Sequence, residues 1–185
     1  MSQPALLSQI WTQSPIFESV LRGVQIVAAS EATALILGES GTGKELIARA
    51  LHAGSSRAAA PYIAVNCATL SESLAESQLF GHKRGAFTSA QSDYAGLIRS
   101  AEGGTLFLDE IAELSLPVQA KLLRFLETGE VLSLGDTQVQ RVNVRLVAAT
   151  HRDLAQLTAS GQFRADLFYR LQVVPIELRP LRARQ

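Results

Sequence analysis

Short apolar runs alternate along this chain with longer segments in which apolar residues recur every three or four positions. The short runs predict buried strands, and the segments with helical spacing predict amphipathic helices. Strands that alternate with helices are typical of an α/β fold with a mostly parallel sheet. We expect strands at residues 34–37, 62–66, 105–108, 144–150 and 173–178, and helices at residues 15–29, 46–52, 70–80, 95–101, 116–126 and 163–171, with one more near Asp153.

Three further segments complete this outline. Pro175 removes a backbone donor from the last expected strand, so that strand should lie at an edge of the sheet. Residues 129–141 alternate around Gly135-Asp136, which indicates a hairpin. Residues 1–13 carry apolar side chains at helix-like spacing, and we expect a short helix or a surface strap there. We therefore expect one α/β unit over residues 14–182, preceded by this strap.

A glycine-rich turn joins the first expected strand to the second expected helix. Such a turn lets several backbone N–H groups point at one anion, and the start of the helix adds further unpaired donors. A lysine at the end of the turn supplies a mobile charge for outer phosphates. The alternative is a turn that binds no ligand, but the spacing, the lysine and the flanking elements all favour a phosphate-binding loop. Its residues are Gly38, Glu39, Ser40, Gly41, Thr42, Gly43, Lys44 and Glu45.

Glu45 departs from the general pattern of such loops, where a serine or threonine usually donates a hydroxyl to magnesium. A carboxylate at this position could reach the metal through water. It could also simply lie in the first turn of the helix, where negative charge is favourable.

Polar residues follow three of the apolar strands, at the strand ends where parallel α/β sheets collect their ligands. Asp109 and Glu110 come directly after a buried strand, and beside a phosphate loop their natural partner is hydrated magnesium. Asp109 would hold the metal, and Glu110 would act as general base on the attacking water. The alternative is a solvated loop.

The polar residues at the other two strand ends each have two possible interpretations. Asn66 is either a site residue or a turn-forming asparagine. Thr150 and His151 could sense the terminal phosphate, or His151 could cap the helix near Asp153.

A polar segment with one aromatic residue follows the third expected helix. Its residues are Gly85, Ala86, Phe87, Thr88, Ser89 and Ala90. Phe87 is either the tip of a mobile loop or a side chain tucked into the core, which is the usual place of a phenylalanine. Composition alone does not decide between these positions.

Composition excludes several classes of protein. Lys plus Arg equals Asp plus Glu, so the chain has no net charge and no general basic field for nucleic acid. A single cysteine, Cys67, excludes an internal disulfide and fits a reducing cytoplasm; its apolar flanks predict a buried, unreactive side chain. No apolar run is long enough to span a membrane, and no signal peptide is evident.

Four motifs in order resemble the central AAA+ ATPase domain of sigma-54-dependent transcriptional activators, the bacterial enhancer-binding proteins. They are the phosphate loop, the segment 85–90, the segment 103–111 with its two acids, and the segment 163–171. The resemblance covers nearly all of residues 14–182. It implies an AAA+ P-loop NTPase, a three-layer αβα sandwich with a mostly parallel five-stranded sheet.

The resemblance also implies roles for individual residues. Lys44 would bind the β- and γ-phosphates of ATP, Asp109 would coordinate Mg2+ and Glu110 would activate water. Asn66 matches a polar switch that restrains the catalytic glutamate. Arg164 and Arg170 match arginine fingers that complete the site of a neighbouring subunit in a hexameric ring. The segment 85–90 matches the loop that grips sigma-54 and remodels the closed complex of RNA polymerase.

Three departures from the family pattern qualify these expectations. His151 stands where the family commonly has asparagine, and Ser89 stands where the gripping loop has glycine. If that glycine uses positive φ, Ser89 would carry a steric cost. The family's helical lid and DNA-binding domain do not fit into residues 1–185, so we expect residues 183–185 to be a truncated start of the link to the lid. We therefore expect weak nucleotide binding and little hydrolysis, and an alternative function as a lidless interaction module that binds sigma-54 or relatives.

Overall fold

The computed structural model describes residues 15–180 and 182 of the chain. The strap expected at residues 1–13 and the link expected at residues 183–185 lie outside the described residues. The elements follow the expected order. They are α1 (Pro15–Ala28), β1 (Ala34–Gly38), α2 (Lys44–Ala53), β2 (Tyr62–Asn66), η2 (Cys67–Thr69), α3 (Glu72–Phe80), α4 (Leu97–Ser100), β3 (Thr105–Asp109), η3 (Ile111–Glu113), α5 (Leu116–Thr128), β4 (Glu130–Val131), β5 (Gln140–Arg141), β6 (Arg145–Thr150), α6 (Leu154–Ala159), α7 (Ala165–Leu171) and β7 (Val174–Leu178).

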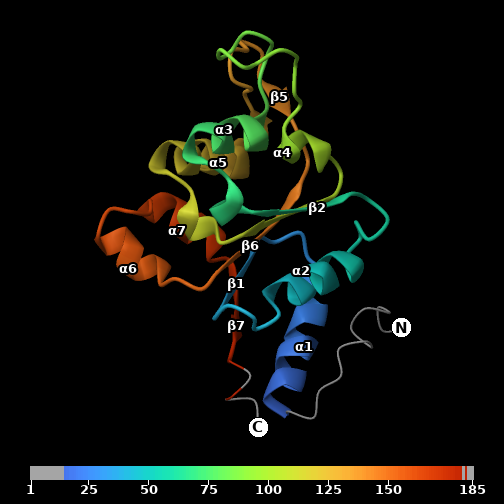
Figure 1. Cartoon of the computed structure of the whole chain (residues 1–185). Coiled ribbons are helices and arrows are strands. Elements are labelled where there is room, and N and C mark those ends of the chain that lie inside the picture. Colours follow the sequence, from blue (N-terminus) through green and yellow to red (C-terminus); the bar gives the residue numbers. More distant parts are fainter. Residues whose placement is uncertain (1–14, 181, 183–185) are drawn as a thin grey trace.

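A five-stranded sheet forms the centre of the molecule, with the strand order β2-β3-β6-β1-β7 (Figure 1). All of its neighbouring strands pair in parallel. The carboxyl ends of β1, β3 and β6 therefore lie side by side at the same end of the sheet, which is where parallel α/β sheets bind ligands. β7 is an edge strand, as Pro175 predicted.

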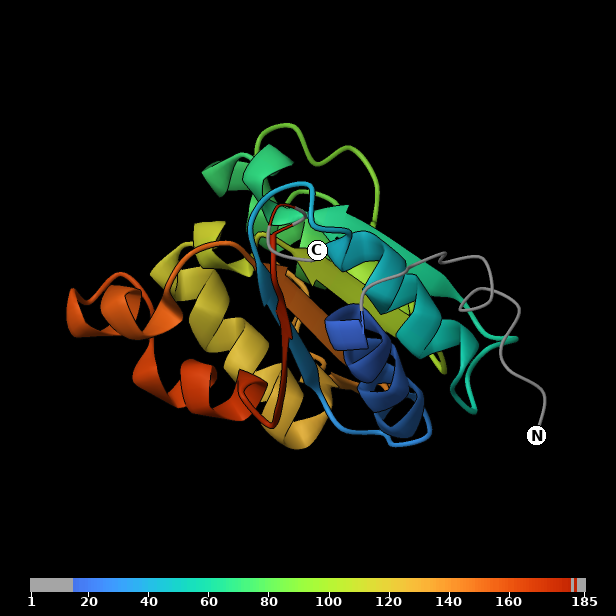
Figure 2. The same cartoon turned by 90° about the horizontal axis from the view of Figure 1, so that it is seen from below.

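Helices cover both faces of the sheet and make three layers (Figure 2). One face packs α1 and α2 against alternate strand residues such as Ile36, Phe107 and Val147. The opposite face packs α3 to α7 against the intervening residues, including Leu35 and Leu108. The alternation of side chains along each strand thus divides the apolar residues between two cores. This confirms the predicted αβα sandwich.

Arg145 shows how the first helix is fixed to the sheet. It begins β6 and is only 2% exposed. Its guanidinium donates to the backbone oxygens of Ala28 (3.0 Å) and Val27 (2.8 Å) at the end of α1. Carbonyls in the last turn of a helix have no partner within the helix. The guanidinium supplies a donor to each of these two, and Ser30 also donates to the Val27 oxygen.

Several elements differ from the sequence expectations. α3 and α4 each begin two positions later than expected, at Glu72 and Leu97. β2 was expected to be buried, but it is an edge strand whose residues are half-buried or exposed. The hairpin at 129–141 is limited to the short strands β4 and β5, and a loop spans the residues between them. α7 begins at Ala165, two positions later than expected, because Arg164 has extended backbone angles (φ −76°, ψ 131°).

No helix within residues 15–180 has the length and apolar character needed to cross a membrane. Cys67 is buried, as expected from its apolar flanks. Burial, with the nearby charges of Asp109 and Glu110, raises the pKa of its thiol to about 12. The thiol therefore stays protonated and unreactive near neutral pH.

Candidate functional site

The phosphate loop connects the end of β1 to the start of α2. Gly43 adopts a left-handed conformation (φ 89°, ψ 27°) directly before the helix, which a side chain would disfavour. The hydroxyl of Thr42 donates to the backbone oxygen of Glu39 at 2.8 Å and closes the loop. The turn and the helix start predicted from sequence are therefore both present.

Close packing at the beginning of the loop requires a residue without a side chain. A Cβ atom on Gly38 would lie 2.9 Å from both the backbone oxygen of Leu178 and the hydroxyl of Thr42. Real Cβ atoms are not found at such distances from backbone atoms. Glycine at position 38 thus lets the loop pass directly beside the edge strand β7.

Lys44 lies inside this turn and is only 6% exposed. Its ammonium donates to the backbone oxygens of Gly38 (3.1 Å) and Glu39 (3.3 Å). Its Nζ atom also lies 3.4 Å from Oε1 of Glu110. A buried charge needs such partners, and here they hold the cation at the carboxyl end of the sheet.

The two acids after β3 lie next to this cation. Asp109 ends the strand, and its carboxylate accepts the backbone N–H of Glu110 at 3.0 Å. Glu110 has φ 51° and ψ 48°, and it is the one non-glycine residue with positive φ in the part of the chain that the structure describes. Left-handed backbone at a glutamate costs free energy and is found mainly at functional sites. The sharp turn brings its carboxylate back towards Lys44.

His151 provides the second contact of Glu110. It follows β6, the strand beside β3, and its Nδ1 lies 2.7 Å from Oε2 of Glu110. The backbone N–H of His151 donates to the same oxygen at 3.3 Å. The carboxylate of Glu110 is therefore held between Lys44 on one oxygen and His151 on the other.

The two neighbouring carboxylates respond differently to this environment. Burial raises the pKa of Asp109 above its ordinary value, and the hydrogen bond from the backbone of Glu110 offsets only part of that effect. Burial also acts to raise the pKa of Glu110, but the hydrogen bonds from His151 and the charge of Lys44 outweigh it and lower that pKa. Glu110 is thus stabilised as a carboxylate, whereas at Asp109 the charge of Lys44 does not overcome the effect of burial.

Asn66 ends β2, beside Asp109 in the strand pairing. Its side-chain oxygen accepts the backbone N–H of Ala68 at 2.9 Å and caps η2. Of the two sequence interpretations, the structure therefore supports the turn-forming asparagine. No hydrogen bond joins Asn66 to Glu110 within the described residues.

Two glutamates of the phosphate loop point away from the buried cation. Glu45 lies in the first turn of α2 and pairs with Arg49 at 2.8 Å on the helix surface. Glu39 forms two hydrogen bonds with Arg182, at 2.8 and 2.6 Å. The simpler expectation for Glu45, a favourable charge at the helix start, describes this arrangement.

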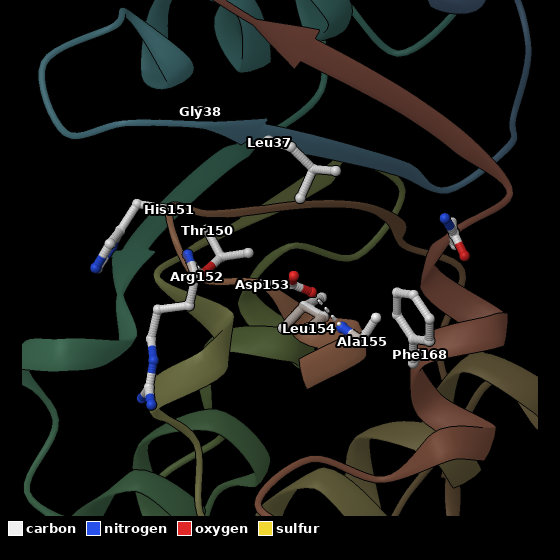
Figure 3. Close-up of a pocket in the computed structure, with 10 residues that line it drawn as sticks. Leu37, Gly38, Thr150, His151, Arg152, Asp153, Leu154, Ala155 and Phe168 are labelled. Carbon is white, nitrogen blue, oxygen red and sulfur yellow. Dashed lines mark hydrogen bonds between the residues drawn. The ribbon is translucent and has the colours of Figure 1, made fainter. Parts of the chain in front are cut away.

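A pocket of about 320 Å³ opens beside the first glycine of the loop. Figure 3 shows Leu37 of β1 and Phe168 of α7 on its apolar walls, and Thr150 at the end of β6. The side chain of His151 points away from the middle of the pocket. Asp153, not His151, caps α6 by accepting the backbone N–H groups of Ala155 and Gln156, so the capping interpretation of His151 is wrong.

The two candidate arginine fingers lie apart from the Lys44–Glu110 pair. Arg164 precedes α7 and forms two hydrogen bonds with Asp166, at 3.1 and 2.7 Å. Arg170 donates to the backbone oxygen of Leu126 at 2.9 Å. Arg170 is exposed, whereas Arg164 is half-buried and its side chain is 40% exposed. Within one copy of the described chain they make no contact with the two acids.

Phe87 occupies a position between the two alternatives posed from sequence. It is half-buried, and its ring packs edge-on against the His82 ring with 5.0 Å between centroids. His82 is itself hydrogen-bonded to the hydroxyl of Ser77 at 2.7 Å. The aromatic side chain therefore lies neither in the core nor free at the tip of a loop.

The segment around Phe87 lies beside the loop between β4 and β5, away from the body of the molecule (Figure 1). The backbone N–H of Lys83 donates to Leu134 at 2.9 Å, and the N–H of Leu134 donates to Gly81 at 3.0 Å. Ser89 has no positive φ, since Glu110 is the only such non-glycine residue described. The conditional steric cost of Ser89 therefore does not arise in this conformation.

Sequence reasoning missed Gln119, a fully buried residue of α5. Its side-chain nitrogen donates to the backbone oxygens of Leu114 (2.7 Å) and Gln162 (3.2 Å), and its oxygen accepts the backbone N–H of Arg164 at 2.9 Å. It thereby joins the segment after the two acids to the start of α7. A polar residue within the apolar stripe of an amphipathic helix was the signal for it.

The carboxylate ligands at this site fit a magnesium ion that is bound together with phosphates. The described residues contain no cluster of three or more His, Cys, Asp or Glu side chains that could hold a metal ion alone. Magnesium is commonly bound by one or two carboxylates, water and substrate phosphates. Asp109, which is half-buried and forms no ion pair in the part of the chain that the structure describes, fits that limited share of the ligands.

Comparisons with known proteins agree with this geometry. A transcription regulator of anaerobic nitric oxide reductase, NorR from Aeromonas hydrophila, is 54% identical over 182 residues, which are 98% of this chain and 35% of that protein. NtrX from Brucella abortus in complex with ATP superimposes with a TM-score of 0.89 at 37% identity, over 95% of this chain and 38% of that one. The P-loop NTPase domain of an Escherichia coli protein described as a sigma-54 transport activator superimposes with a TM-score of 0.60 at 22% identity, over 92% of this chain and 99% of that one, and supports the fold alone.

The chain thus spans little more than a third of the first two proteins. The sigma-54 interaction domain matches residues 10–177. With its parallel sheet, phosphate loop and paired acids, this chain belongs to the family of sigma-54 interaction domains and has the P-loop NTPase fold.

Proposed function

We propose that this chain is the ATP-binding and ATP-hydrolysing core of a sigma-54-dependent transcriptional activator. The observation that supports this most directly is the meeting of Lys44 with Glu110 at the carboxyl edge of the sheet, 3.4 Å apart. A phosphate-binding loop and a base for water are two of the parts that recur in enzymes that hydrolyse a phosphoanhydride. The ATP complex of the similar NtrX supports nucleotide binding at this fold.

Each part of the site has a distinct role in this proposal. The backbone N–H groups of the loop and the Lys44 ammonium bind the β- and γ-phosphates, where the start of α2 also favours negative charge. Glu110 accepts a proton from the attacking water. Two further residues lie at the same carboxyl end of the sheet. Asn66 is beside Asp109 in the strand pairing, and Thr150 ends β6.

Asp109 would hold magnesium together with the phosphates. When bound, the ion would neutralise charge that develops on the phosphate oxygens. The raised pKa of Asp109 fits this role, because the carboxylate gains stability only when a positive charge is brought next to it.

The partner in this proposal is sigma-54 in the RNA polymerase holoenzyme, and the segment 85–90 with Phe87 is the surface that contacts it. Arg164 and Arg170 act between copies of the chain, where each would complete the site of its neighbour in a ring. Their solvent-accessible side chains, which pair with Asp166 and the Leu126 backbone instead of the acids of their own copy, support this assignment. Because RNA polymerase acts in the bacterial cytoplasm, we expect the protein to work there.

The direct test compares the wild-type chain with a Glu110→Gln variant in nucleotide binding and in phosphate release. Removal of a general base is expected to lower turnover about 100-fold or more. Binding of ATP should stay, because Lys44 and the loop backbone are unchanged. Equal turnover in both proteins would refute the assignment of Glu110 as base.

The same experiment distinguishes the proposed ATPase from the alternative function as an interaction module. A wild-type chain that binds ATP and sigma-54 but releases no phosphate, alone or at concentrations that favour ring assembly, would be an interaction module. Size measurement with and without ATP, made on the same samples, distinguishes an inactive monomer from an inactive ring.

A further inference from the structure

Gln119 is a polar side chain in an otherwise apolar part of the molecule. It is fully buried on α5, where the other buried residues are Val118, Leu122 and Phe125. Burial of an amide among such side chains costs free energy unless its hydrogen-bonding groups find partners. The presence of glutamine at this position is therefore explained by the groups that its amide contacts.

The amide of Gln119 has three backbone partners, and all three lie in connecting segments. Its nitrogen donates to the carbonyl oxygens of Leu114 at 2.7 Å and Gln162 at 3.2 Å. Its oxygen accepts the backbone N–H of Arg164 at 2.9 Å. Two carbonyls on one side of the amide and an N–H on the other fit only this orientation of its nitrogen and oxygen. The side chain thus joins two segments that are distant in the sequence.

One of these segments follows directly from the proposed base. η3 begins after Glu110, and its backbone N–H at Glu113 donates to the carbonyl of Glu110 at 3.0 Å. Leu114 ends this short helix by donating to Ile111. The carbonyl of Leu114, which Gln119 binds, is therefore part of the compact turn that starts at the acids.

The other segment carries Arg164, whose backbone and side chain are held very differently. The backbone has extended angles (φ −76°, ψ 131°), its N–H is bound by the buried amide, and the neighbouring Phe163 is only 2% exposed. The guanidinium pairs at the surface with the exposed carboxylate of Asp166. Surface pairs of this kind are weak. The side chain can therefore exchange its partner while its Cα position stays fixed.

We infer that Gln119 is a positioning residue for Arg164, whose backbone it fixes relative to the segment after the proposed base. This inference rests on the proposed function, in which Arg164 completes the site of a neighbouring copy. An arginine that reaches into another copy has to be placed by contacts within its own copy, and Gln119 supplies one from α5. Arg170 lies within α7, so the helix itself holds its backbone.

Gln119→Met tests the inference, because it keeps the length of the side chain and removes the amide. The value of kcat should fall roughly 10- to 100-fold, as expected when a catalytic group is displaced by about 1 Å. ATP affinity should stay at the wild-type value, since the partners of Gln119 lie outside the phosphate loop. Thr105→Val is the matched control, because it removes another buried hydrogen bond, to His52, and should leave kcat unchanged. Wild-type kcat in Gln119→Met would overturn the inference.

A carboxyl group at position 119 provides a second variant. Gln119→Glu keeps an oxygen for the N–H of Arg164, and burial between two carbonyl oxygens favours the protonated form, which can donate to one of them. Because the contact with Arg164 survives, this variant should keep at least about a tenth of the wild-type turnover. A folded Gln119→Glu variant with less turnover than that would overturn the inference, whether or not Gln119→Met folds.

Mixtures of variants show on which side of an interface Gln119 acts. Gln119→Met mixed with Glu110→Gln should recover up to about a quarter of the wild-type turnover, because some interfaces of a head-to-tail ring then combine an intact base with a correctly placed arginine. Gln119→Met mixed with Arg164→Ala should recover nothing, since neither copy places that arginine. Recovery with Arg164→Ala would overturn the inference, because Gln119 would then act on the base of its own copy. No recovery with Glu110→Gln would overturn it as well, by indicating a general structural defect.

The contact with Arg164 can also be measured without turnover. Amide hydrogen exchange of the folded, nucleotide-free chain should show the N–H of Arg164 protected, and Gln119→Met should speed its exchange about tenfold or more. The N–H of Phe168, which donates to the carbonyl of Arg164 at 3.0 Å, should stay protected and verifies that α7 is intact. Equal exchange at Arg164 in both proteins would overturn the inference.

Reference measurements separate a failure of this inference from a failure of the proposed function. If the wild-type chain has no turnover, or if Arg164→Ala keeps it, the proposed function is wrong and the role of Gln119 falls with it. If Arg164→Ala is inactive and complements Glu110→Gln while Gln119→Met is fully active, only the role of Gln119 is wrong.

Discussion

The Lys44 ammonium lies 3.4 Å from Oε1 of Glu110, although the two residues come from different strand ends, after β1 and after β3. Both groups are largely buried, at 6% and 13% exposure. The strand between them in the sheet is β6, which supplies His151 to the other oxygen of Glu110. Residues at the carboxyl ends of three neighbouring parallel strands are therefore brought together at the carboxylate of Glu110.

The acids at 109 and 110 should have opposite effects on stability near neutral pH. The folded-state pKa of Glu110 is lowered, so its contribution is present above its unfolded pKa of about 4.3 and is lost as the pH falls through the folded pKa. The folded-state pKa of Asp109 is raised, so its contribution is present below about 3.9 and is lost as the pH rises through the folded pKa.

Glu110→Gln should therefore destabilise the chain near neutral pH, by about 1–3 kcal/mol for a hydrogen-bonded charge, and Asp109→Asn should stabilise it. Both differences should disappear in acid. Urea unfolding at a series of pH values measures them. Differences that persist unchanged at low pH would contradict the charge-based explanation.

The position of Phe87, packed against His82, predicts that a substitution there separates partner binding from ATP binding. Phe87→Ala should weaken binding to sigma-54 by roughly tenfold or more, as for an interface anchor, and should leave ATP affinity unchanged because the segment lies far from the phosphate loop (Figure 1). Pull-down with a transition-state nucleotide mimic measures the first, and calorimetry the second.

Tyr94→Ala is a suitable control for the Phe87 variant. Tyr94 is 38% exposed and also lies against the His82 ring, at 5.7 Å between centroids. If the loss of any aromatic side chain on this ring weakened sigma-54 binding equally, the specific role of Phe87 would be wrong.

Arg164, directly before α7, and Arg170, within α7, predict complementation between two inactive variants. Arg164→Ala or Arg170→Ala should retain ATP binding and lose turnover, because each acts on the site of a neighbouring copy in the proposed ring. Mixing either variant with Glu110→Gln should restore part of the activity, since some interfaces then combine an intact base with an intact arginine. Arg124→Ala, an exposed α5 residue paired with Glu130 at 3.0 Å, is the matched control. Mixtures without any gain would argue against arginines that act between copies.

The buried guanidinium of Arg145 predicts a stability effect remote from the site. Arg145→Met would remove the guanidinium donors from the carbonyls of Ala28 and Val27, of which Val27 keeps its contacts with Ser30, and we expect a loss of about 1–3 kcal/mol in the free energy of unfolding. Arg141→Met, at an 80% exposed side chain, should change stability by no more than about 0.5 kcal/mol. Equal effects of the two substitutions would show that burial of Arg145 does not determine its contribution.

Local sequence patterns were sufficient to predict the sheet, the phosphate loop and the acids. Each of these depends on neighbouring residues: apolar runs, a glycine-rich turn before a helix, or two carboxylates after a strand. The edge position of β7 followed from a single proline. The positions of these features were predicted correctly because the physical cause of each lies within a few residues of it.

The rest depends on contacts between distant segments. Glu110 and His151 are 41 positions apart, so their hydrogen bond could not be read from either motif. Arg164 was expected within a helix, but the buried amide of Gln119 accepts its backbone N–H and the helix starts after it. Asn66 could not be assigned from sequence because turn formation and ligand contact use the same side chain.

Isothermal calorimetry of the folded chain with ATP and ADP, in the presence of magnesium, tests the central claim most directly. We predict saturable binding to the wild-type chain, and about 10- to 100-fold weaker binding to Lys44→Ala, because that variant loses a charged hydrogen-bond donor to the phosphates. Circular dichroism on the same samples verifies that both proteins are folded. A folded wild-type chain that binds neither nucleotide, or a Lys44→Ala variant that binds both as well as the wild type does, would contradict the account.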